Sequence, residues 1–257
     1  MDQIVKYPRT QHIEGSGLQK GDIKEYFPFK KLIGKYLVIE EKLDGSNVGI
    51  SFDSDQKLLL QSRGHYLTGH PREFHFSYFK QWANERKNLL WCILKDRYIL
   101  YAEYTFATHC IFYNSLRSYV NEFDIFDKKT NTFLSTNKRY HLLRNFRSDG
   151  IVSVPIRWDG IFDGTPLINF IEKSYYCNDN VAGDFEKAYI ASENKKPLEK
   201  INRGIDVTGI MEGLYIKEED DEKVLNRYKY VRKGFLQTVF DNEGHWIERN
   251  IIKNIIK

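Results

Sequence analysis

Residues 40–52 carry the sequence "EEKLDGSNVGISF", which combines a strand with a turn rich in chemically reactive side chains. Val48, Ile50 and Phe52 alternate with small or polar residues, and this period of two predicts a half-buried β-strand. The turn before the strand contains Lys42 and Asp44. A lysine beside an Asp-Gly turn is usually a solvated turn residue, but its amine can also attack phosphorus as a nucleophile. The rest of the chain has to decide between these two interpretations.

A nucleophilic lysine needs particular neighbours. Its amine attacks only when neutral, and because its reference pKa is about 10.4, deprotonation at pH 7 costs about 4–5 kcal/mol. Burial, neighbouring cations or a metal ion lower that cost. We therefore expect further basic residues and carboxylates at the ends of other strands, where they could surround Lys42.

Candidate neighbours recur along the chain in segments that we predict to be strands. Each is weak evidence by itself, because a glutamate in a strand usually faces solvent and a phenylalanine usually belongs to the core. Their joint order carries the information. The candidates are Arg63 in "QSRGHYL", Glu103 in "YAEY", Phe123 in "NEFDIFD", Glu212 and Lys217 in "MEGLYIK", and Arg227, Lys229 and Arg232 in "RYKYVR".

Hydrophobic periodicity predicts an α+β domain with antiparallel strands in two sheets and helices outside them. The strongest predicted helix is 71–94, where Pro71 suits the first turn, and shorter helices are predicted near 136–146 and over 181–195. The predicted strands are 36–41, 47–53, 57–62, 98–104, 119–126, 150–156, 209–217 and 227–232.

The composition is that of a globular protein of one large or two small domains, with 257 residues, 41% hydrophobic and 29% charged. A net charge of +4 is compatible with a nucleic-acid partner without requiring one. Cys92, Cys110 and Cys177 are widely spaced, which predicts neither a disulfide framework nor a cysteine zinc site. No signal peptide or membrane span is recognisable, so we expect a cytoplasmic protein without membrane contact.

The pattern Lys42-x-Asp44-Gly45-x-Asn47 resembles motif I of the covalent nucleotidyltransferases, the superfamily of ATP-dependent ligases and mRNA capping enzymes. The segments "SRG", "YAEY", "EFDIFD", "EGLYIK" and "YKYVR" are similar to its motifs Ia, III, IIIa, IV and V, in the same order. "YPRTQHIEGSGLQKGD" before motif I and "LQSRGHYLTGHPREFHFSYFKQWA" after it resemble the RNA ligase branch that seals nicked RNA.

The resemblance implies the nucleotidyltransferase fold of DNA and RNA ligases, an ATP-grasp-like α+β fold with antiparallel sheets and flanking helices. It also implies an ATP-dependent RNA ligase that requires Mg²⁺ or Mn²⁺ and acts in RNA repair. Lys42 would attack the α-phosphorus of ATP, releasing pyrophosphate and retaining AMP covalently. The AMP would pass to the 5′-phosphate of an RNA, and a 3′-hydroxyl would then join the ends. Each step requires neutralisation of charge around phosphorus.

The resemblance also assigns roles to matching positions. Lys42 would be the nucleophile, Glu212 would organise the divalent metal, and Lys229 would neutralise the α-phosphate. The other implied nucleotide contacts are Glu41 to the adenine edge, Asn47 and Arg63 to ribose and phosphate, Arg63 also to the RNA 5′-phosphate, Glu103 to a ribose hydroxyl, Phe123 stacked on adenine, and Lys217 as an assisting residue.

Motif V departs from the Lys-x-Lys pattern of the family. It is either Arg227-x-Lys229 or Lys229-x-Val231, and only Lys229 is common to both alignments. In the second alignment Val231 replaces one lysine, and Arg227 or Arg232 would have to substitute for it. An arginine there would bind phosphate but could not give up a proton.

The motif positions predict three parts: a lead-in of residues 1–35 packed on the catalytic domain, a nucleotidyltransferase domain of residues 36–235, and a tail of residues 236–257. Many relatives carry a further C-terminal domain, and we expect a bare catalytic domain here. Isoleucines four apart in 245–257 predict an amphipathic helix, which would either dock on the domain's own core or bind a repair partner protein.

Two further patterns are rejected as functional sites. His65, His70 and His75 recur every five residues, so one helix face cannot gather them around a metal, although His65 could still contact RNA. "GSGLQKGD" lacks the Gly-Lys-Ser/Thr ending of a phosphate-binding loop. The rival hypotheses are the same chemistry on nicked DNA or on a cap, and a non-catalytic RNA-binding subunit of a repair complex.

Overall fold

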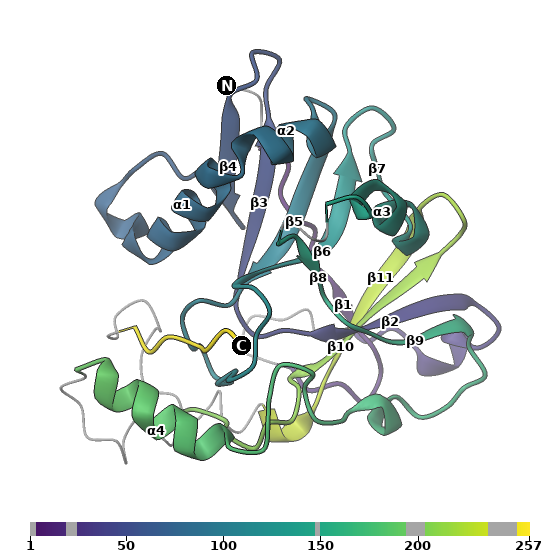
Figure 1. The fold of residues 1–257 in the computed structure, drawn as a ribbon. Helices are drawn as coiled ribbons and strands as arrows, with labels where there is room; N and C mark the ends of the chain where they lie inside the picture. The colour runs from purple at the N-terminus through teal and green to yellow at the C-terminus, as the bar shows by residue number, and fades with distance from the viewer. Residues whose placement is uncertain (1–3, 19–24, 147–149, 194–203, 236–250) are drawn as a thin grey trace.

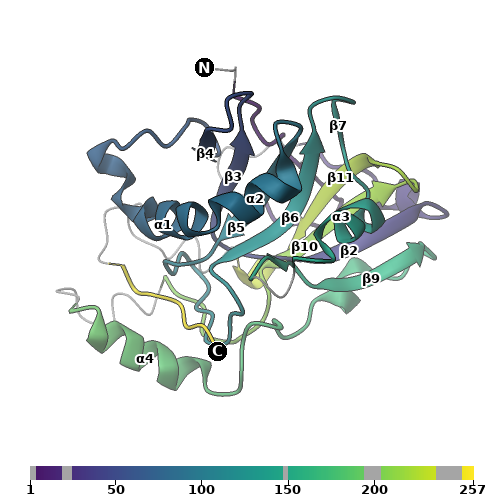
Figure 2. The ribbon, with the colours of Figure 1, turned by 45° about the horizontal axis from the view of Figure 1, so that its top comes forward.

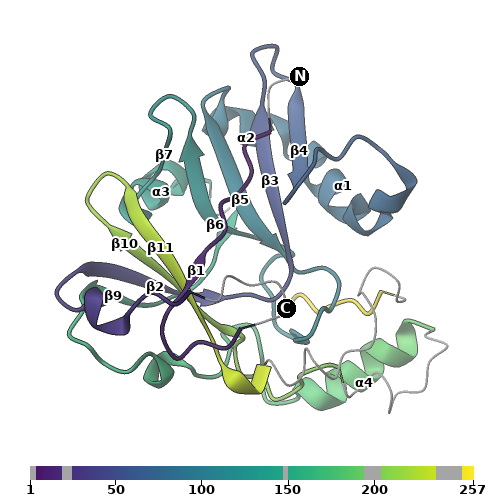
Figure 3. The same cartoon turned by 180° about the vertical axis from the view of Figure 1, so that it is seen from behind.

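The computed structural model describes residues 4–18, 25–146, 150–193, 204–235 and 251–257. Its main strands form two sheets that lie next to each other and splay apart from the point where β2 passes into β3 (Figures 1 and 3). Helices lie outside the sheets (Figure 2). The predicted α+β class with antiparallel sheets and flanking helices is therefore confirmed.

The first sheet has five strands, in the order β1 (Gln11–His12), β11 (Val224–Val231), β10 (Gly213–Glu219), β2 (Tyr36–Lys42) and β9 (Ile156–Ile161). All neighbours are antiparallel except β1 and β11. Alternate residues of its strands, such as Leu37, Ile39, Leu214 and Ile216, point into a hydrophobic cluster on the outer face. The 3₁₀ helices η1 (Phe29–Leu32) and η4 (Leu167–Phe170) add side chains to this cluster.

The second sheet has the order β4 (Leu58–Ser62), β3 (Ser46–Phe52), β5 (Tyr98–Tyr104), β6 (Val120–Asp127) and β7 (Thr132–Phe133), with β8 (Val152–Ser153) parallel to β6. Val48, Ile50 and Phe52 face a second cluster, as their alternation predicts. The helices α1 (Ser77–Glu85) and α2 (Lys87–Leu94) cover this face, and α3 (Thr136–Leu143) lies beside β6 (Figure 2).

The region predicted as one helix over 71–94 forms three separate helices in the structure. η2 (Pro71–Phe76) leads into α1, and Arg86 breaks the path between α1 and α2 with a non-helical backbone. The Arg86 guanidinium lies 4.9 Å from the ring centre of Trp82. The break turns Phe79 and Trp82 of α1, and Leu90 of α2, toward the same hydrophobic cluster.

Several other boundaries differ from the predictions. β10 begins four residues later than the strand expected over 209–217, and β11 begins three residues earlier than the strand expected over 227–232. The single strand expected over 150–156 is divided into β8 and the start of β9, with Pro155 between them. Proline has no N–H to donate to a ladder, which explains the interruption. The helix expected over 181–195 is α4 (Val181–Ala191). Among the described residues, no helix combines the length and apolar character needed to cross a membrane.

The amphipathic helix predicted over 245–257 is wrong for residues 251–257, and residues 245–250 lie outside the described residues. Segment 251–257 is extended and forms bridges to Ala107 and Leu116. Ile252 and Asn254 are buried, while Lys253 between them is exposed, so the pattern has period two. A spacing of four residues between isoleucines fits both a helix and an extended strand. Hydrogen bonds to residues 106–116 stabilise the extended form.

Candidate active site

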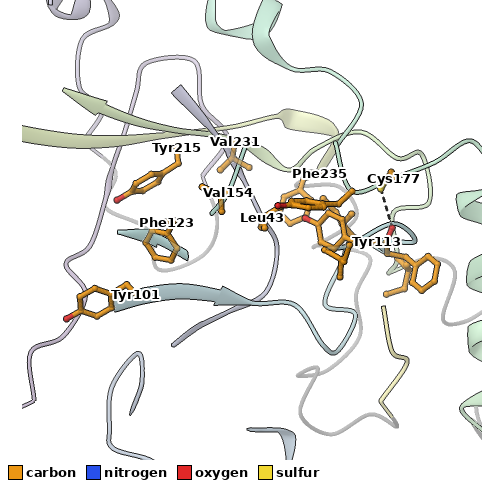
Figure 4. Close-up of a cluster of buried hydrophobic side chains, with 14 of the residues drawn as sticks. Leu43, Tyr101, Tyr113, Phe123, Val154, Cys177, Tyr215, Val231 and Phe235 are labelled. Atoms are coloured by element: carbon orange, nitrogen blue, oxygen red, sulfur yellow. Dashed lines mark hydrogen bonds between the residues drawn. The ribbon is translucent and has the colours of Figure 1, made fainter. Parts of the chain in front are cut away.

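The turn that joins the two sheets carries the candidate nucleophile. β2 ends at Lys42 in the five-stranded sheet, and β3 begins at Ser46 in the six-stranded sheet. Leu43 packs into the core between the sheets, among Val154, Val231 and other side chains (Figure 4). A Cβ at Gly45 would lie 2.6 Å from the carbonyl oxygen of Tyr104. The close approach of this turn to β5 therefore requires glycine.

Asp44 fixes the turn through its side chain and its backbone. Its Oδ2 accepts hydrogen bonds from the amides of Cys110 at 2.7 Å and Ile111 at 2.8 Å. Its own amide donates to the hydroxyl of Tyr113 at 2.9 Å. Asp44 is thus bound to the loop between β5 and β6, and this fixes the path of the chain two residues beyond Lys42.

Lys42 forms an ion pair with Glu212, with 2.6 Å between Nζ and Oε1. The pairing of β2 with β10 causes this contact, because Gly213 lies opposite Lys42 and Glu212 directly precedes it. Burial lowers the pKa of Lys42, but Glu212 and Glu103 outweigh that effect and raise the pKa above its usual value. The expectation that the surroundings lower this pKa is therefore not met, because the nearest charges are carboxylates.

Glu103 brings a second carboxylate to Lys42 from the other sheet. Burial raises the pKa of Glu103 to about 8; Lys42 opposes this shift, and the charges of Glu212 and Asp44 add to it. Burial likewise raises the pKa of Glu212 to about 7, against the attraction of Lys42. Three carboxylates surround one ammonium group, so the site is suited to receive additional positive charge.

Asn47 and Arg63 extend the site along the six-stranded sheet. Asn47 on β3 is paired with Glu103 on β5, and Ser62 at the end of β4 is paired with Val48. Arg63 follows Ser62 directly, so it leaves β4 level with Asn47. The Arg63 side chain is exposed, and Oδ1 of Asn47 is buried with no hydrogen-bond partner among the described residues. The Arg63 side chain is therefore accessible to a bound molecule, whereas the Asn47 oxygen is buried and lacks a partner among the described residues.

The structure places the three candidate cations of motif V, Arg227, Lys229 and Arg232, in different surroundings. Lys229 lies close enough to Glu212 for its charge to lower that carboxyl pKa. Arg227 instead packs its guanidinium 3.8 Å from the ring centre of Phe133 and 3.9 Å from Asp124. Arg232 donates to Asp206 and, at 2.7 Å, to the carbonyl of Met211. The Arg232 amide donates to the carbonyl of Glu212 at 3.1 Å, but of these three side chains only that of Lys229 is brought to the Glu212 carboxylate.

Glu41 and Lys42 are consecutive strand residues and point to opposite faces of the sheet. The Glu41 carboxylate is buried, accepts from Arg157 at 2.7 Å and from the amide of Tyr175 at 3.2 Å, and also accepts from Ser174. Burial raises the pKa of Glu41, and Arg157 opposes that shift. The structure does not bring the Glu41 carboxylate together with the Lys42 amine.

Phe123 lies in the core between the two sheets, next to Tyr215 and Tyr101 (Figure 4). Its ring centre is 5.1 Å from that of Tyr7 and 5.9 Å from that of Tyr215, both in edge-on geometry. The residue is only 9% exposed. A base that stacks on Phe123 would therefore lie among these aromatic rings.

Lys217 is fully buried and lies away from Lys42. It is paired in register with Val38, four residues along β10 from the Gly213–Lys42 pair, which corresponds to about 13 Å. Its amine lies 2.8 Å from Glu40 and 3.2 Å from Asp124. The structure therefore places Lys217 in a buried charge network and not beside the candidate nucleophile.

This buried charge network has Arg139 at its centre. The Arg139 guanidinium lies 2.9 Å from Glu122, 3.1 Å from Glu40 and 3.8 Å from Asp124, and its side chain is fully buried. Lys217 and Arg227 add two more cations, so the network balances three carboxylates with three positive charges. It ties α3 to β2, β6, β10 and β11, and so holds both sheets beside the site.

Most residues of the charge network, and those that hold the turn beside Lys42, were not predicted from the sequence. The two acidic residues Glu122 and Asp124 in the buried strand β6 were a local signal of the network, because buried charges need partners. A bulge places them opposite the adjacent residues Ala102 and Tyr101 of β5. No sequence signal identified Arg139, Tyr113 or Asn254, because their contacts lie far along the chain.

The donor set can be tested for a divalent metal. Oε2 of Glu212 is buried and has no hydrogen-bond partner among the described residues. Within the described part of the chain, no three His, Cys, Asp or Glu side chains are grouped to hold a metal by themselves. The residues therefore fit a metal held partly by Glu212 and otherwise by water or phosphate oxygens, which is the usual manner of Mg²⁺.

The fold has counterparts among solved structures. An apo mutant of Naegleria gruberi RNA ligase matches with a TM-score of 0.53 and 15% identity, over 90% of this chain and 62% of that chain. A second mutant of Naegleria gruberi RNA ligase, solved with AMP and Mn, matches with a TM-score of 0.51 and 16% identity, over 91% and 62%. The chain thus spans about three fifths of the length of these neighbours. The predicted nucleotidyltransferase-type ligase fold is confirmed.

The family assignment comes from the sequence match. A comparison with curated proteins finds no match. The family model described as RNA ligase matches residues 35–231, which include every motif from Lys42 to Val231. The chain belongs to the RNA ligase family.

Proposed function

We propose that this chain is an ATP-dependent RNA ligase that adenylates itself on Lys42 and joins RNA 3′-hydroxyl and 5′-phosphate ends. The observation that carries the proposal is the 2.6 Å contact of Lys42 with Glu212, with Glu103 and Lys229 beside it. These residues come from four separate motifs on both sheets. A solvated turn lysine is not expected to have three ionisable side chains close to its amine.

The first step joins Lys42 to the α-phosphorus of ATP. The ammonium must first lose a proton, and Oε1 of Glu212 is the acceptor in contact with it. The amine then forms a P–N bond while the bond from the α-phosphorus to pyrophosphate breaks, which leaves AMP on Lys42. Lys229, beside Glu212, is placed to neutralise the charge that develops on the phosphate.

Mg²⁺ or Mn²⁺ would be held at Glu212, whose Oε2 has no partner among the described residues. When bound, the ion supplies positive charge that neutralises phosphate oxygens and competes with the Lys42 ammonium for the Glu212 carboxylate. A Naegleria gruberi RNA ligase structure of the same fold contains AMP and Mn, which supports the proposal that this protein binds a nucleotide and a divalent metal.

The nucleotide would lie in the space bordered by the row Arg63, Asn47 and Glu103. Glu103 and the unpaired Oδ1 of Asn47 are acceptors suited to ribose hydroxyls, and the exposed Arg63 is suited to a phosphate. Adenine would stack on Phe123, and the Glu41 carboxylate could reach its edge only by leaving Arg157. Lys217 would act indirectly, by holding the carboxylates beneath this region.

The second and third steps act on RNA. The AMP passes from Lys42 to an RNA 5′-phosphate, and a 3′-hydroxyl then attacks that phosphate and displaces AMP. We place this activity in RNA repair in the cytoplasm. Membership of the RNA ligase family supports RNA as the substrate. A repair partner that contacts 245–257 would have to use residues other than the buried Ile252 and Asn254.

The test is incubation with α-labelled ATP or GTP and a divalent metal, followed by a denaturing gel. A label from ATP that survives denaturation and disappears in Lys42→Ala supports the proposal. Label from GTP alone would indicate a capping activity, and no label in the native protein would indicate a non-catalytic RNA-binding subunit. Parallel assays on nicked RNA and nicked DNA distinguish an RNA ligase from a DNA ligase.

A further inference from the structure

Segment 251–257 lies against the loop that connects β5 to β6. The amide of Asn254 donates to the carbonyl of Phe106 at 3.0 Å, and the amide of Ile255 donates to the carbonyl of Tyr113 at 2.9 Å. In return, the amide of Thr108 donates to Ile252 at 2.8 Å, and that of Leu116 donates to Ile255 at 2.9 Å. The segment is therefore attached to this loop along its length.

Asn254 is the most strongly held residue of the segment, and it is 1% exposed. Its side-chain oxygen accepts from the amide of Tyr113 at 2.9 Å and from the hydroxyl of Thr108 at 3.1 Å. Its side-chain nitrogen donates to the carbonyl of Thr105 at 2.8 Å. One amide side chain thus holds three points of the loop.

The same loop holds the turn that carries Lys42. The amides of Cys110 and Ile111 donate to the carboxylate of Asp44, and the hydroxyl of Tyr113 accepts from the Asp44 amide. Tyr113 is the common member: its backbone is bound by Asn254, and its side chain binds Asp44. Tyr113 therefore connects segment 251–257 directly to the turn beside Lys42.

We propose that Asn254 is a positioning residue for the adenylation step: by fixing residues 105–113, it holds Asp44 and so keeps Lys42 aligned with Glu212. The inference rests on the proposed function. Asn254 touches neither Lys42 nor Glu212, and its effect passes through Tyr113. Because reacting groups must be held within fractions of an ångström, a loosened turn would slow the chemical step more than it would weaken nucleotide binding.

The test measures single-turnover adenylation of the full chain across ATP concentrations, with temperatures chosen so that every variant is folded. Asn254→Ala is expected to lower the maximal rate of adduct formation about tenfold and to change the half-saturating ATP concentration less than about twofold. Lys253→Ala is the matched control, because Lys253 is an exposed neighbour in the same segment. It should leave both parameters unchanged.

A double-mutant cycle tests the route through Tyr113. Tyr113→Phe removes only the hydroxyl that binds Asp44 and should also slow adenylation. If Asn254 acts through Tyr113, the double variant will be little slower than the slower single variant. A cycle in which the two effects multiply would overturn the route through Tyr113.

The remaining outcomes separate this inference from the proposed function. A folded Asn254→Ala protein that adenylates at the wild-type rate, beside an active wild type, would overturn the inference alone. A loss seen only in ATP affinity, with the maximal rate unchanged, would overturn it as well. A wild-type protein that forms no adduct would overturn the proposed function and this inference with it.

Discussion

The amine of Lys42 and the carboxylate of Glu212 are 2.6 Å apart, at the point where the two sheets meet. Each residue is held by a different constraint. Glu212 lies beside Lys42 because β10 pairs with β2, and Lys42 is positioned by a turn that Asp44 anchors to the β5–β6 loop. The Glu212 and Glu103 carboxylates raise the pKa of Lys42 and so favour its ammonium form in this structure.

Glu103→Gln should stabilise the protein increasingly as the pH rises. The pKa of Glu103 is raised to about 8, whereas a carboxyl in the unfolded chain titrates near 4.3. Between these values the folded state binds a proton that the unfolded state has lost, so this group makes stability fall with rising pH. Glutamine removes the effect, and we expect a gain of roughly 1–3 kcal/mol near pH 8.5 and little near pH 5.

Urea unfolding of wild type and variant at both pH values measures this difference. Glu85→Gln serves as the control, because its carboxylate on α1 is 56% exposed and lies outside the site. A stability gain from Glu103→Gln that is equal at both pH values would contradict the raised pKa.

Lys229→Ala should mainly slow adenylation, whereas Arg227→Ala should mainly destabilise the fold. Lys229 lies beside Glu212, so its loss should slow adduct formation by about 10²-fold or more and change stability by less than about 1 kcal/mol. Arg227 neutralises the buried Asp124, so its loss should destabilise the fold by about 2–4 kcal/mol. Adenylation kinetics and urea unfolding on both variants check this. Equal kinetic loss at matched folded fractions would show that Arg227 also serves motif V.

Arg139→Ala should destabilise the protein by about 3–5 kcal/mol, because three buried carboxylates lose their central partner. Lys138→Ala on the same helix is the control, since the Lys138–Glu222 pair is exposed and should contribute less than about 1 kcal/mol. Chemical denaturation compares the two variants. Similar stabilities for both would mean that the network is not stabilised by Arg139.

Gly45→Ala should displace the turn beside Lys42. The added methyl group would lie 2.6 Å from the carbonyl oxygen of Tyr104, so the turn and β5 must separate. We expect a loss of stability of about 1–3 kcal/mol together with at least tenfold slower adenylation. Gly64→Ala is the stability control, because nothing lies within 4 Å of a Cβ at that position. Unchanged adenylation in Gly45→Ala would show that the position of Lys42 tolerates this shift.

Much of the fold was predictable because its signals are local. The alternation of Val48, Ile50 and Phe52 predicted β3, and similar patterns located β2, β5 and β6 within about one residue. The order of Lys42, Glu103, Glu212 and Lys229 predicted a shared site, and the structure brings these four together. Periodicity did not separate α1 from α2, because the apolar pattern continues across Arg86.

The sequence by itself determined which residues could do the chemistry and which faces of the strands are apolar, since side-chain type and period are properties of the local chain. Only the tertiary structure decided which charges meet. It turned the Glu41 carboxylate toward Arg157, buried Lys217 and Arg227 in the network around Arg139, and left Lys229 as the motif V cation beside Glu212. It also made residues 251–257 an extended segment, because hydrogen bonds to residues more than a hundred positions away outweigh local helical spacing. Contacts at that separation depend on how the sheets pair, and no local pattern encodes them.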